Sequence, residues 1–163
     1  GTGAYGLALI AVDGKPPRPF GWRHSPGVRI VLQPENQGAS MKAPSWFAIG
    51  IVIAGFSQGG AVAYQLALSD PRPLAGLLAL SAYFPTARSI RLHDANRALP
   101  ILVCHGSLDP VVPEELGHQA HQTLLAMGYA AGYKTYPIGH NVSPEEIADV
   151  SRWLRVTLGL KSQ

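Results

Sequence analysis

From residue 51 onward, short apolar runs alternate with segments whose residues favour helices, and this alternation limits the folds available to the chain. The apolar runs at 51–54, 74–80 and 101–104 show no polar alternation, which is typical of parallel strands buried on both faces. The remaining predicted elements are a fourth strand at 133–136, helices at 61–68 and 113–127, and a last helix from Ser143 to Leu158. Strands and helices in this order predict an α/β fold with a mostly parallel sheet and helices on both faces.

The two later helices show which of their faces is expected to be buried. Helix 113–127 has an apolar stripe that predicts its inner face: Leu116, Ala120, Leu124 and Met127. The last helix opens with a capping box, in which Ser143 is the N-cap and Glu146 occupies the third helical position. Its expected buried face consists of Ile147, Val150, Leu154 and Leu158.

Length and composition narrow the class of protein further. The 163 residues suit a single domain, 1–163, and 47% apolar against 14% charged residues excludes a disordered chain or a coiled coil. The net charge of +3 comes without a basic stripe, so no nucleic-acid partner is expected. Cys104 is the only cysteine, which excludes an intramolecular disulfide. The early apolar run at 7–12 is too short to span a bilayer, and the expected location is the cytoplasm.

A pentapeptide at the end of the first buried strand carries the clearest chemical signal. Residues 55–59 read Gly-Phe-Ser-Gln-Gly, which matches the Gly-x-Ser-x-Gly nucleophile elbow. The motif follows a predicted strand and opens a predicted helix, which is the setting in which a sharp turn presents the serine hydroxyl above a sheet. Ser57 is therefore the predicted nucleophile, and a glycine-rich turn with an incidental serine is the alternative.

A serine hydroxyl needs a histidine to remove its proton, and the chain offers six histidines. His140 follows a predicted strand, precedes a capped helix and comes last in the chain, as the Ser-Asp-His order of such hydrolases requires. His105 also ends a strand but precedes its candidate acid. The remaining four do not follow a predicted strand: His24, His93, His118 and His121. His118 and His121 could form a metal site with Glu114, but a solvated helix face is the simpler interpretation.

The acid of such a triad should follow a strand that lies between the serine and the histidine in the chain. Asp109, in the segment His-Gly-Ser-Leu-Asp-Pro at 105–110, is the only carboxylate that meets this condition. The alternative is an ordinary turn residue before Pro110. Three residues at three strand ends in the expected order favour a Ser57, Asp109 and His140 triad.

Four segments together resemble the phospholipase/carboxylesterase family of α/β-hydrolases, which includes bacterial carboxylesterases and acyl-protein thioesterases. These segments are Gly-Phe-Ser-Gln-Gly-Gly-Ala-Val at 55–62, Leu-Ser-Ala-Tyr-Phe-Pro at 80–85, His-Gly-Ser-Leu-Asp-Pro-Val-Val at 105–112 and Tyr-Pro-Ile-Gly-His at 136–140. The resemblance implies an α/β-hydrolase fold and assigns Ser57 as nucleophile, Asp109 as orienting acid and His140 as base.

The front of the chain departs from the family pattern. Members carry a His-Gly-Leu-Gly-Ala-Asp-Gly loop, and residues 1–6 are similar to it without its histidine and its preceding strand. By this resemblance the backbone N–H groups of Thr2 and Gln58 form the oxyanion hole, and a flexible terminus is the alternative for Thr2. The resemblance also implies an early strand at 28–32. The helical segment that members have before the elbow strand is missing at the junction of Gly50 and Ile51, so part of the N-terminal half is absent or the 33–50 segment does not reach the site.

The resemblance implies a serine esterase that hydrolyses carboxylic esters of short to medium acyl chains through an acyl-enzyme, with no metal and no cofactor. Two alternatives stay open: an acyl-protein thioesterase or lysophospholipase, and a non-catalytic fragment or binding module. The expected partner is a small-molecule ester or thioester, and a homodimer is left open. The resemblance also implies acyl-pocket walls, for which core packing is the alternative: Trp46, Tyr83, Phe84, Val111 and Val112.

Overall fold

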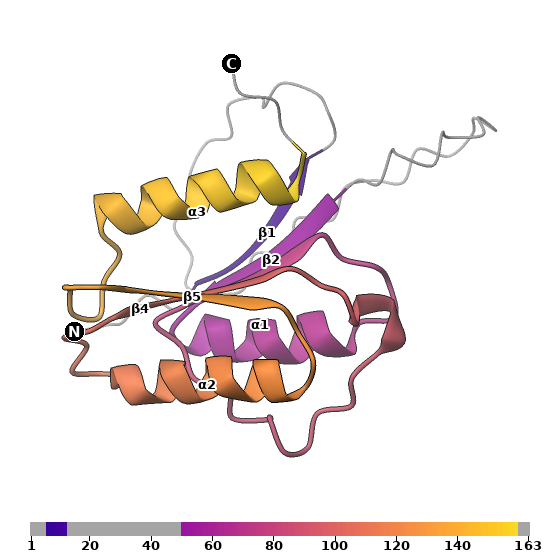
Figure 1. The fold of residues 1–163 in the computed structure, drawn as a ribbon, viewed down its shortest axis with the longest axis horizontal. Coiled ribbons are helices and arrows are strands. Elements are labelled where there is room, and N and C mark those ends of the chain that lie inside the picture. The colour runs from indigo at the N-terminus through magenta and orange to yellow at the C-terminus, as the bar shows by residue number, and fades with distance from the viewer. Residues whose placement is uncertain (1–5, 13–49, 160–163) are drawn as a thin grey trace.

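The fold is built on a five-stranded sheet, seen in a computed structural model that describes residues 6–12 and 50–159 (Figure 1). The strands follow one another in chain order across the sheet: β1 (Gly6–Val12), β2 (Gly50–Phe56), β3 (Gly76–Leu80), β4 (Ile101–Gly106) and β5 (Ala131–Tyr136). Strands β2 to β5 are parallel, and β1 pairs antiparallel with β2. The sheet is therefore mostly parallel, as the apolar runs predict.

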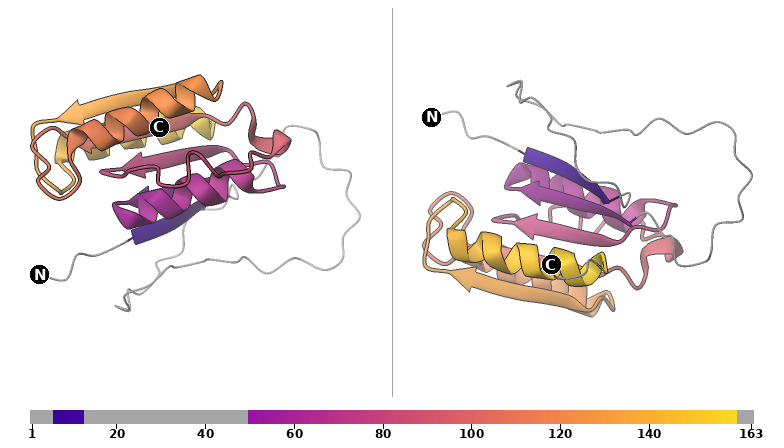
Figure 2. Two further views of the ribbon diagram at one scale, coloured as in Figure 1. Left: turned by 90° about the horizontal axis from the view of Figure 1, so that it is seen from below. Right: turned by 90° about the horizontal axis from the view of Figure 1, so that it is seen from above.

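Within the described residues, three helices cover the two faces of this sheet. Helices α1 (Gln58–Ser69) and α2 (Glu114–Ala126) lie side by side on one face, and α3 (Pro144–Thr157) lies alone on the other (Figure 2). A short 3-10 turn, Asp94–Asn96, precedes β4. This arrangement confirms the predicted α/β class with helices on both faces. Each helix follows a strand, so the loops at the carboxyl ends of the parallel strands open toward one edge of the sheet.

The core is divided by the sheet into two apolar clusters. The larger one lies between the sheet and the pair α1 and α2, and includes the fully buried side chains of Tyr64, Leu77 and Leu124. The smaller one lies under α3, where Val150 and Trp153 pack against Leu102 and other residues of the sheet. The uninterrupted apolar character of β2, β3 and β4 follows from this burial on both faces.

The inner faces of α2 and α3 differ from the predicted stripes. On α2, Ala120 and Leu124 are buried as predicted, but Leu116 is exposed and the neighbouring Gly117 faces the sheet instead. On α3, Ile147 is 58% exposed, and the buried residue of the first turn is Glu146. Both stripes are therefore wrong by one residue at their N-terminal end. The buried imidazole of His105, in the strand Ile101–Gly106, takes the space opposite α2, where only Gly117 leaves room for it, and the buried side chain of Glu146 takes the corresponding space under α3.

Only one of the two hydrogen bonds of the predicted capping box of α3 is formed. The Ser143 hydroxyl accepts the backbone N–H of Glu146 at 3.1 Å, as an N-cap serine should. Glu146 does not return the bond, because its carboxylate is turned under the helix. Neither of its oxygens has a hydrogen-bond partner among the described residues. Burial raises the pKa of Glu146 above its ordinary value.

We expect Glu146→Gln to stabilise the protein at neutral pH. A carboxyl group whose pKa is raised in the folded state binds more protons folded than unfolded, so stability falls as pH rises through its titration. Glutamine removes the buried charge, so it should raise the free energy of unfolding near pH 7 and change it little below about pH 4, where the carboxyl group is itself neutral. The measurement is chemical denaturation at both pH values. Glu145→Gln, an exposed neighbour in the same turn, controls for the helix dipole, and equal effects of the two variants would contradict the prediction.

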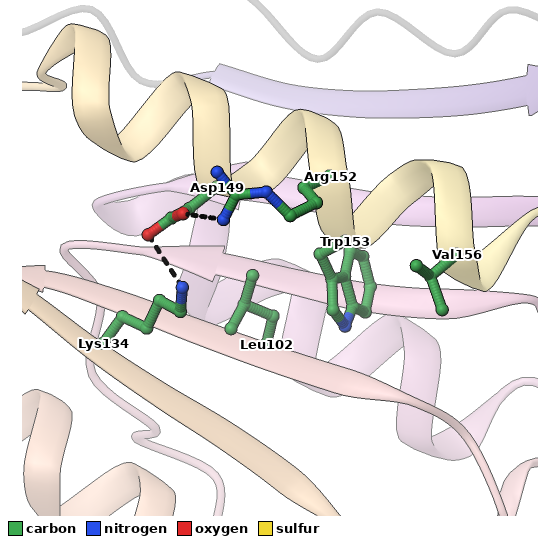
Figure 3. Close-up of a pocket in the computed structure, with 6 residues that line it drawn as sticks. All are labelled: Leu102, Lys134, Asp149, Arg152, Trp153 and Val156. Carbon is green, nitrogen blue, oxygen red and sulfur yellow. Dashed lines mark hydrogen bonds and ion pairs between the residues drawn. The ribbon is translucent and has the colours of Figure 1, made fainter. Parts of the chain in front are cut away.

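A groove of about 250 Å³ lies between α3 and the sheet. Figure 3 shows Trp153 and Val156 reaching down from α3 toward Leu102 on β4, with Asp149 joined to Lys134 of β5 and to Arg152. None of its lining residues belongs to the predicted triad.

The structure describes only part of the front of the chain, where the sequence analysis raised the junction of Gly50 and Ile51 and a strand at 28–32. Gly50 and Ile51 are consecutive residues of one strand, β2, and pair with Val12 and Ala11 of β1. The apolar run at 7–12 lies in β1, an element that the sequence interpretation did not assign. The expected strand at 28–32 lies outside the described residues. Within the described parts of the chain, no helix has the length and apolar character needed to cross a bilayer.

Candidate active site

The turn from β2 into α1 places Ser57 in a backbone conformation that residues other than glycine rarely adopt. Its φ is 57° and its ψ is −122°. The turn is tight enough that a Cβ at Gly55 would collide with the backbone of Gly59, and a Cβ at Gly60 would collide with Ala82. Gly55 and Gly60 are therefore required because neither position has room for a Cβ, and the serine carries the strain of the elbow.

The Ser57 hydroxyl is not used to cap the helix that it precedes. Serine is a favoured N-cap residue, yet Ser57 makes no side-chain cap bond, and only its carbonyl accepts the N–H groups of Gly60 and Ala61. Its Oγ lies 3.0 Å from Nε2 of His140 instead. The hydroxyl therefore faces an imidazole that can accept its proton.

His140 lies on the loop between β5 and α3, where it is partly exposed. Its Nδ1 lies 2.7 Å from Oδ2 of Asp109, and the side chain keeps 18% of its surface accessible. The ring of Phe56 packs against the imidazole with centroids 4.8 Å apart. Because a carboxylate can only accept, Nδ1 carries the proton of the neutral ring and Nε2 presents its lone pair to Ser57.

Asp109 is held from its other side by the loop that follows it. Its Oδ1 accepts the backbone N–H groups of Val111 and Val112, each at 2.9 Å. Burial by itself would raise the pKa of Asp109, but the bonds from His140, Val112 and Val111 outweigh it and hold the pKa below its ordinary value. The carboxylate is therefore ionised at neutral pH and oriented by three donors.

The structure thus brings together the three residues that the sequence singles out, from loops after β2, β4 and β5. Their separation along the chain is large, 83 residues from Ser57 to His140, so only the parallel sheet makes them neighbours. The geometry permits transfer of the serine proton to His140 while Asp109 stabilises the imidazolium that forms.

The other predicted site residues fall in different places. Gln58 is the first residue of α1, where a backbone N–H has no partner within the helix and can meet an anion. Thr2 and Trp46 lie outside the described residues. Tyr83 is half-buried, and Val111 is 64% exposed beside Asp109.

Two of the predicted pocket walls are packed into the interior. Phe84 stacks on Tyr64 with ring centroids 4.6 Å apart, within the larger apolar cluster. Val112 is buried, and its backbone N–H is bound to Asp109. These positions match the core-packing alternative for both residues.

The histidine pair on α2 is not arranged as a metal site. His121 binds the carbonyl of Ala131 at 2.9 Å and stacks on Tyr133, and His118 meets the edge of the same tyrosine. No group of three or more histidine, cysteine or acidic side chains within the described ranges is placed to hold a metal ion.

Two contacts around the site were not predicted from the sequence. Phe56 packs on the catalytic-type imidazole, and its place inside the elbow motif, directly before Ser57, was the available signal. The backbone N–H groups of Val111 and Val112 on Asp109 could not be assigned from residue types, because any residue except proline supplies them.

Comparison with known proteins agrees with this geometry. A model of the family described as phospholipase/carboxylesterase matches residues 48–158. An acyl-protein thioesterase 1 of Gibberella zeae is 38% identical over 117 residues, which cover 69% of this chain and 50% of that protein. A protein of Oryza sativa subsp. japonica named as a probable carboxylesterase is 35% identical over 108 residues, 64% of this chain and 41% of that protein.

A solved structure shares the fold. The crystal structure of Arabidopsis thaliana SOBER1 is 30% identical, with a TM-score of 0.61, over 66% of this chain and 52% of that chain. The chain spans about half the length of the curated relatives it matches.

Proposed function

Because the chain belongs to the phospholipase/carboxylesterase family, whose model matches residues 48–158, we propose that it is a serine esterase acting on carboxylic esters of short to medium acyl chains. The observation that carries the proposal is the continuous contact from Ser57 Oγ to His140 Nε2 at 3.0 Å and from His140 Nδ1 to Asp109 Oδ2 at 2.7 Å. A binding module has no need of this arrangement.

The reaction follows from the positions of these atoms. His140 Nε2 takes the proton of Ser57 as Oγ attacks the ester carbonyl, and the N–H of Gln58 at the start of α1 donates to the oxyanion. The tetrahedral intermediate collapses, the carbon–oxygen bond of the ester breaks, and His140 returns the proton to the departing alcohol. Water then attacks the acyl-enzyme, with His140 as base, and releases the acid and the Ser57 hydroxyl.

The acyl-chain preference rests on the apolar surface beside the triad. Leu108 and Val111 flank Asp109 and are 69% and 64% exposed, so they offer contact to an acyl chain of limited length. Each buried methylene adds about 0.8 kcal/mol of binding, so catalytic efficiency should rise with chain length only as far as this contact extends.

We expect kcat/KM for p-nitrophenyl esters to increase from acetate toward butyrate or octanoate and to be lower for palmitate. The measurement is initial-rate hydrolysis of the four esters at equal, submicellar concentration. Leu108→Ser and Val111→Ser should flatten the dependence, whereas Val62→Ser, an exposed apolar residue of α1, is the control. A preference for palmitate would contradict the short-chain assignment.

A second candidate, a thioesterase, is supported by the name of the Gibberella zeae relative, which is 38% identical. The same three residues would attack a thioester carbonyl, and the departing group would be a thiolate that leaves without needing a proton. Comparing kcat/KM for the oxygen ester and the thioester of the same acyl chain separates the two functions, because a thioesterase should favour the thioester at every chain length.

A further inference from the structure

The strongest polar feature that the proposed mechanism leaves unused is a histidine behind the triad. His105 is the fifth of the six residues of β4 and has no exposed surface. Its Nε2 lies 2.8 Å from the backbone oxygen of Val112. A carbonyl oxygen can only accept, so Nε2 carries the proton of the neutral ring and donates it to this bond.

The opposite side of the ring is closed by α2. Nδ1 of His105 has no partner among the described residues. Gly117 faces it so closely that a Cβ at that position would collide with the imidazole. The ring of His105 therefore packs against the backbone of α2 on one side and makes its one hydrogen bond on the other. That bond determines the orientation of the ring.

That bond ends on the same residue that holds the acid of the triad. Val112 accepts from His105 through its carbonyl and donates to Oδ1 of Asp109 through its N–H. His105 Nε2 itself lies 3.8 Å from Oδ2 of Asp109, beyond hydrogen-bond distance. The histidine therefore reaches the carboxylate through Val112.

We propose that His105 is a positioning residue for the hydrolysis, which fixes Val112 and so keeps the Asp109 carboxylate directed at Nδ1 of His140. The proposal rests on the proposed esterase function. Without the bond, the buried carbonyl of Val112 loses its donor, and the loop that carries Asp109 shifts to find another. A displacement of about 1 Å in such a group can lower turnover by roughly 100-fold.

The test compares His105→Leu, which lacks a donor, with His105→Gln, whose amide N–H₂ can reach the Val112 carbonyl from a similar distance. We expect kcat of the leucine variant to fall by about 10- to 100-fold at a temperature where circular dichroism shows a folded protein, with KM unchanged. The glutamine variant should recover most of kcat. A merely structural histidine would lower thermal stability without this split between kcat and KM.

The chain offers a matched control in His121. Its Nε2 also binds a backbone carbonyl, that of Ala131, and its Nδ1 is also buried without a partner in the described residues, but it does not contact the triad loop. His121→Leu should therefore leave kcat unchanged. If His105→Leu does not fold, His105→Asn takes its place, because the shorter amide cannot reach Val112.

A second readout separates this proposal from the proposed function. The proton between His140 Nδ1 and Asp109 gives a far-downfield proton resonance in NMR spectra, whether or not the protein turns over an ester. We expect His105→Leu to shift or broaden this resonance and His121→Leu to leave it unchanged. A folded leucine variant with wild-type kcat or with an unchanged resonance would overturn the positioning role. An inactive wild-type protein with the resonance present would count against the esterase function alone.

Discussion

Ser57→Ala is expected to lower kcat for p-nitrophenyl butyrate by up to roughly 10⁶-fold, because the substitution removes the atom that attacks the carbonyl. The remaining groups, chiefly the N–H at the start of α1, cannot form an acyl-enzyme. Alanine keeps a Cβ in the same backbone conformation, and the close approaches at Gly55 and Gly60 that shape the elbow are untouched. The fold and its stability should therefore be retained, which circular dichroism and thermal denaturation check.

A serine at the far end of the same helix provides the control. Ser69 ends α1, and its hydroxyl donates to the carbonyl of Gln65. Ser69→Ala should keep full activity. Ser57→Ala with undiminished hydrolysis would mean that Ser57 is not the nucleophile, whatever its distance from His140.

Asp109→Asn is expected to lower kcat by about 10⁴-fold. An amide that presents its N–H₂ group to His140 favours the wrong tautomer of the imidazole, and a neutral side chain gives the imidazolium no counter-charge. The KM should change little, since Asp109 is buried and does not face the substrate. Asp94→Asn, an exposed carboxylate in the turn before β4, is the matched control in the same kinetic assay.

The same substitution should change how stability depends on pH. The pKa of Asp109 is lowered in the folded state, so the unfolded chain binds more protons and the carboxylate stabilises the fold above its ordinary pKa. This stabilisation is lost as pH falls through the lowered folded value. Asp109→Asn should therefore destabilise the protein near pH 7 and have a smaller effect below about pH 3, measured by urea denaturation. An effect independent of pH would show that the charge contributes nothing.

The parts of the fold that could be predicted from sequence are those in which local signals agree with the packing. The buried strands β2, β3 and β4 carry apolar side chains toward both faces, so their pattern needs no knowledge of their neighbours. Ser57 and Asp109 could be selected because each follows such a strand, and His140 because it follows the fourth predicted strand and comes last in the chain. Their order along the chain, serine, then acid, then histidine, is the order of the α/β-hydrolase fold.

The inner faces of α2 and α3 could not be predicted, because they depend on what the sheet presents to them. The imidazole of His105 occupies the space opposite α2, and only the glycine at 117 leaves room for it, so Leu116 is turned outward. Under α3, Asp149 binds Lys134 and Tyr136 of β5, which fixes the rotation of the helix and leaves Ile147 exposed. Polar partners from distant strands thus override the apolar periodicity.

The strained turn at Ser57 also has a consequence for how this chain can change over generations. Glycine adopts a φ of 57° without the steric cost of a Cβ, which is of the order of 1–3 kcal/mol in such conformations. A single substitution at this position would therefore give a more stable turn and no nucleophile. The serine therefore costs the fold stability that glycine would not, a cost expected at a position where the hydroxyl is used.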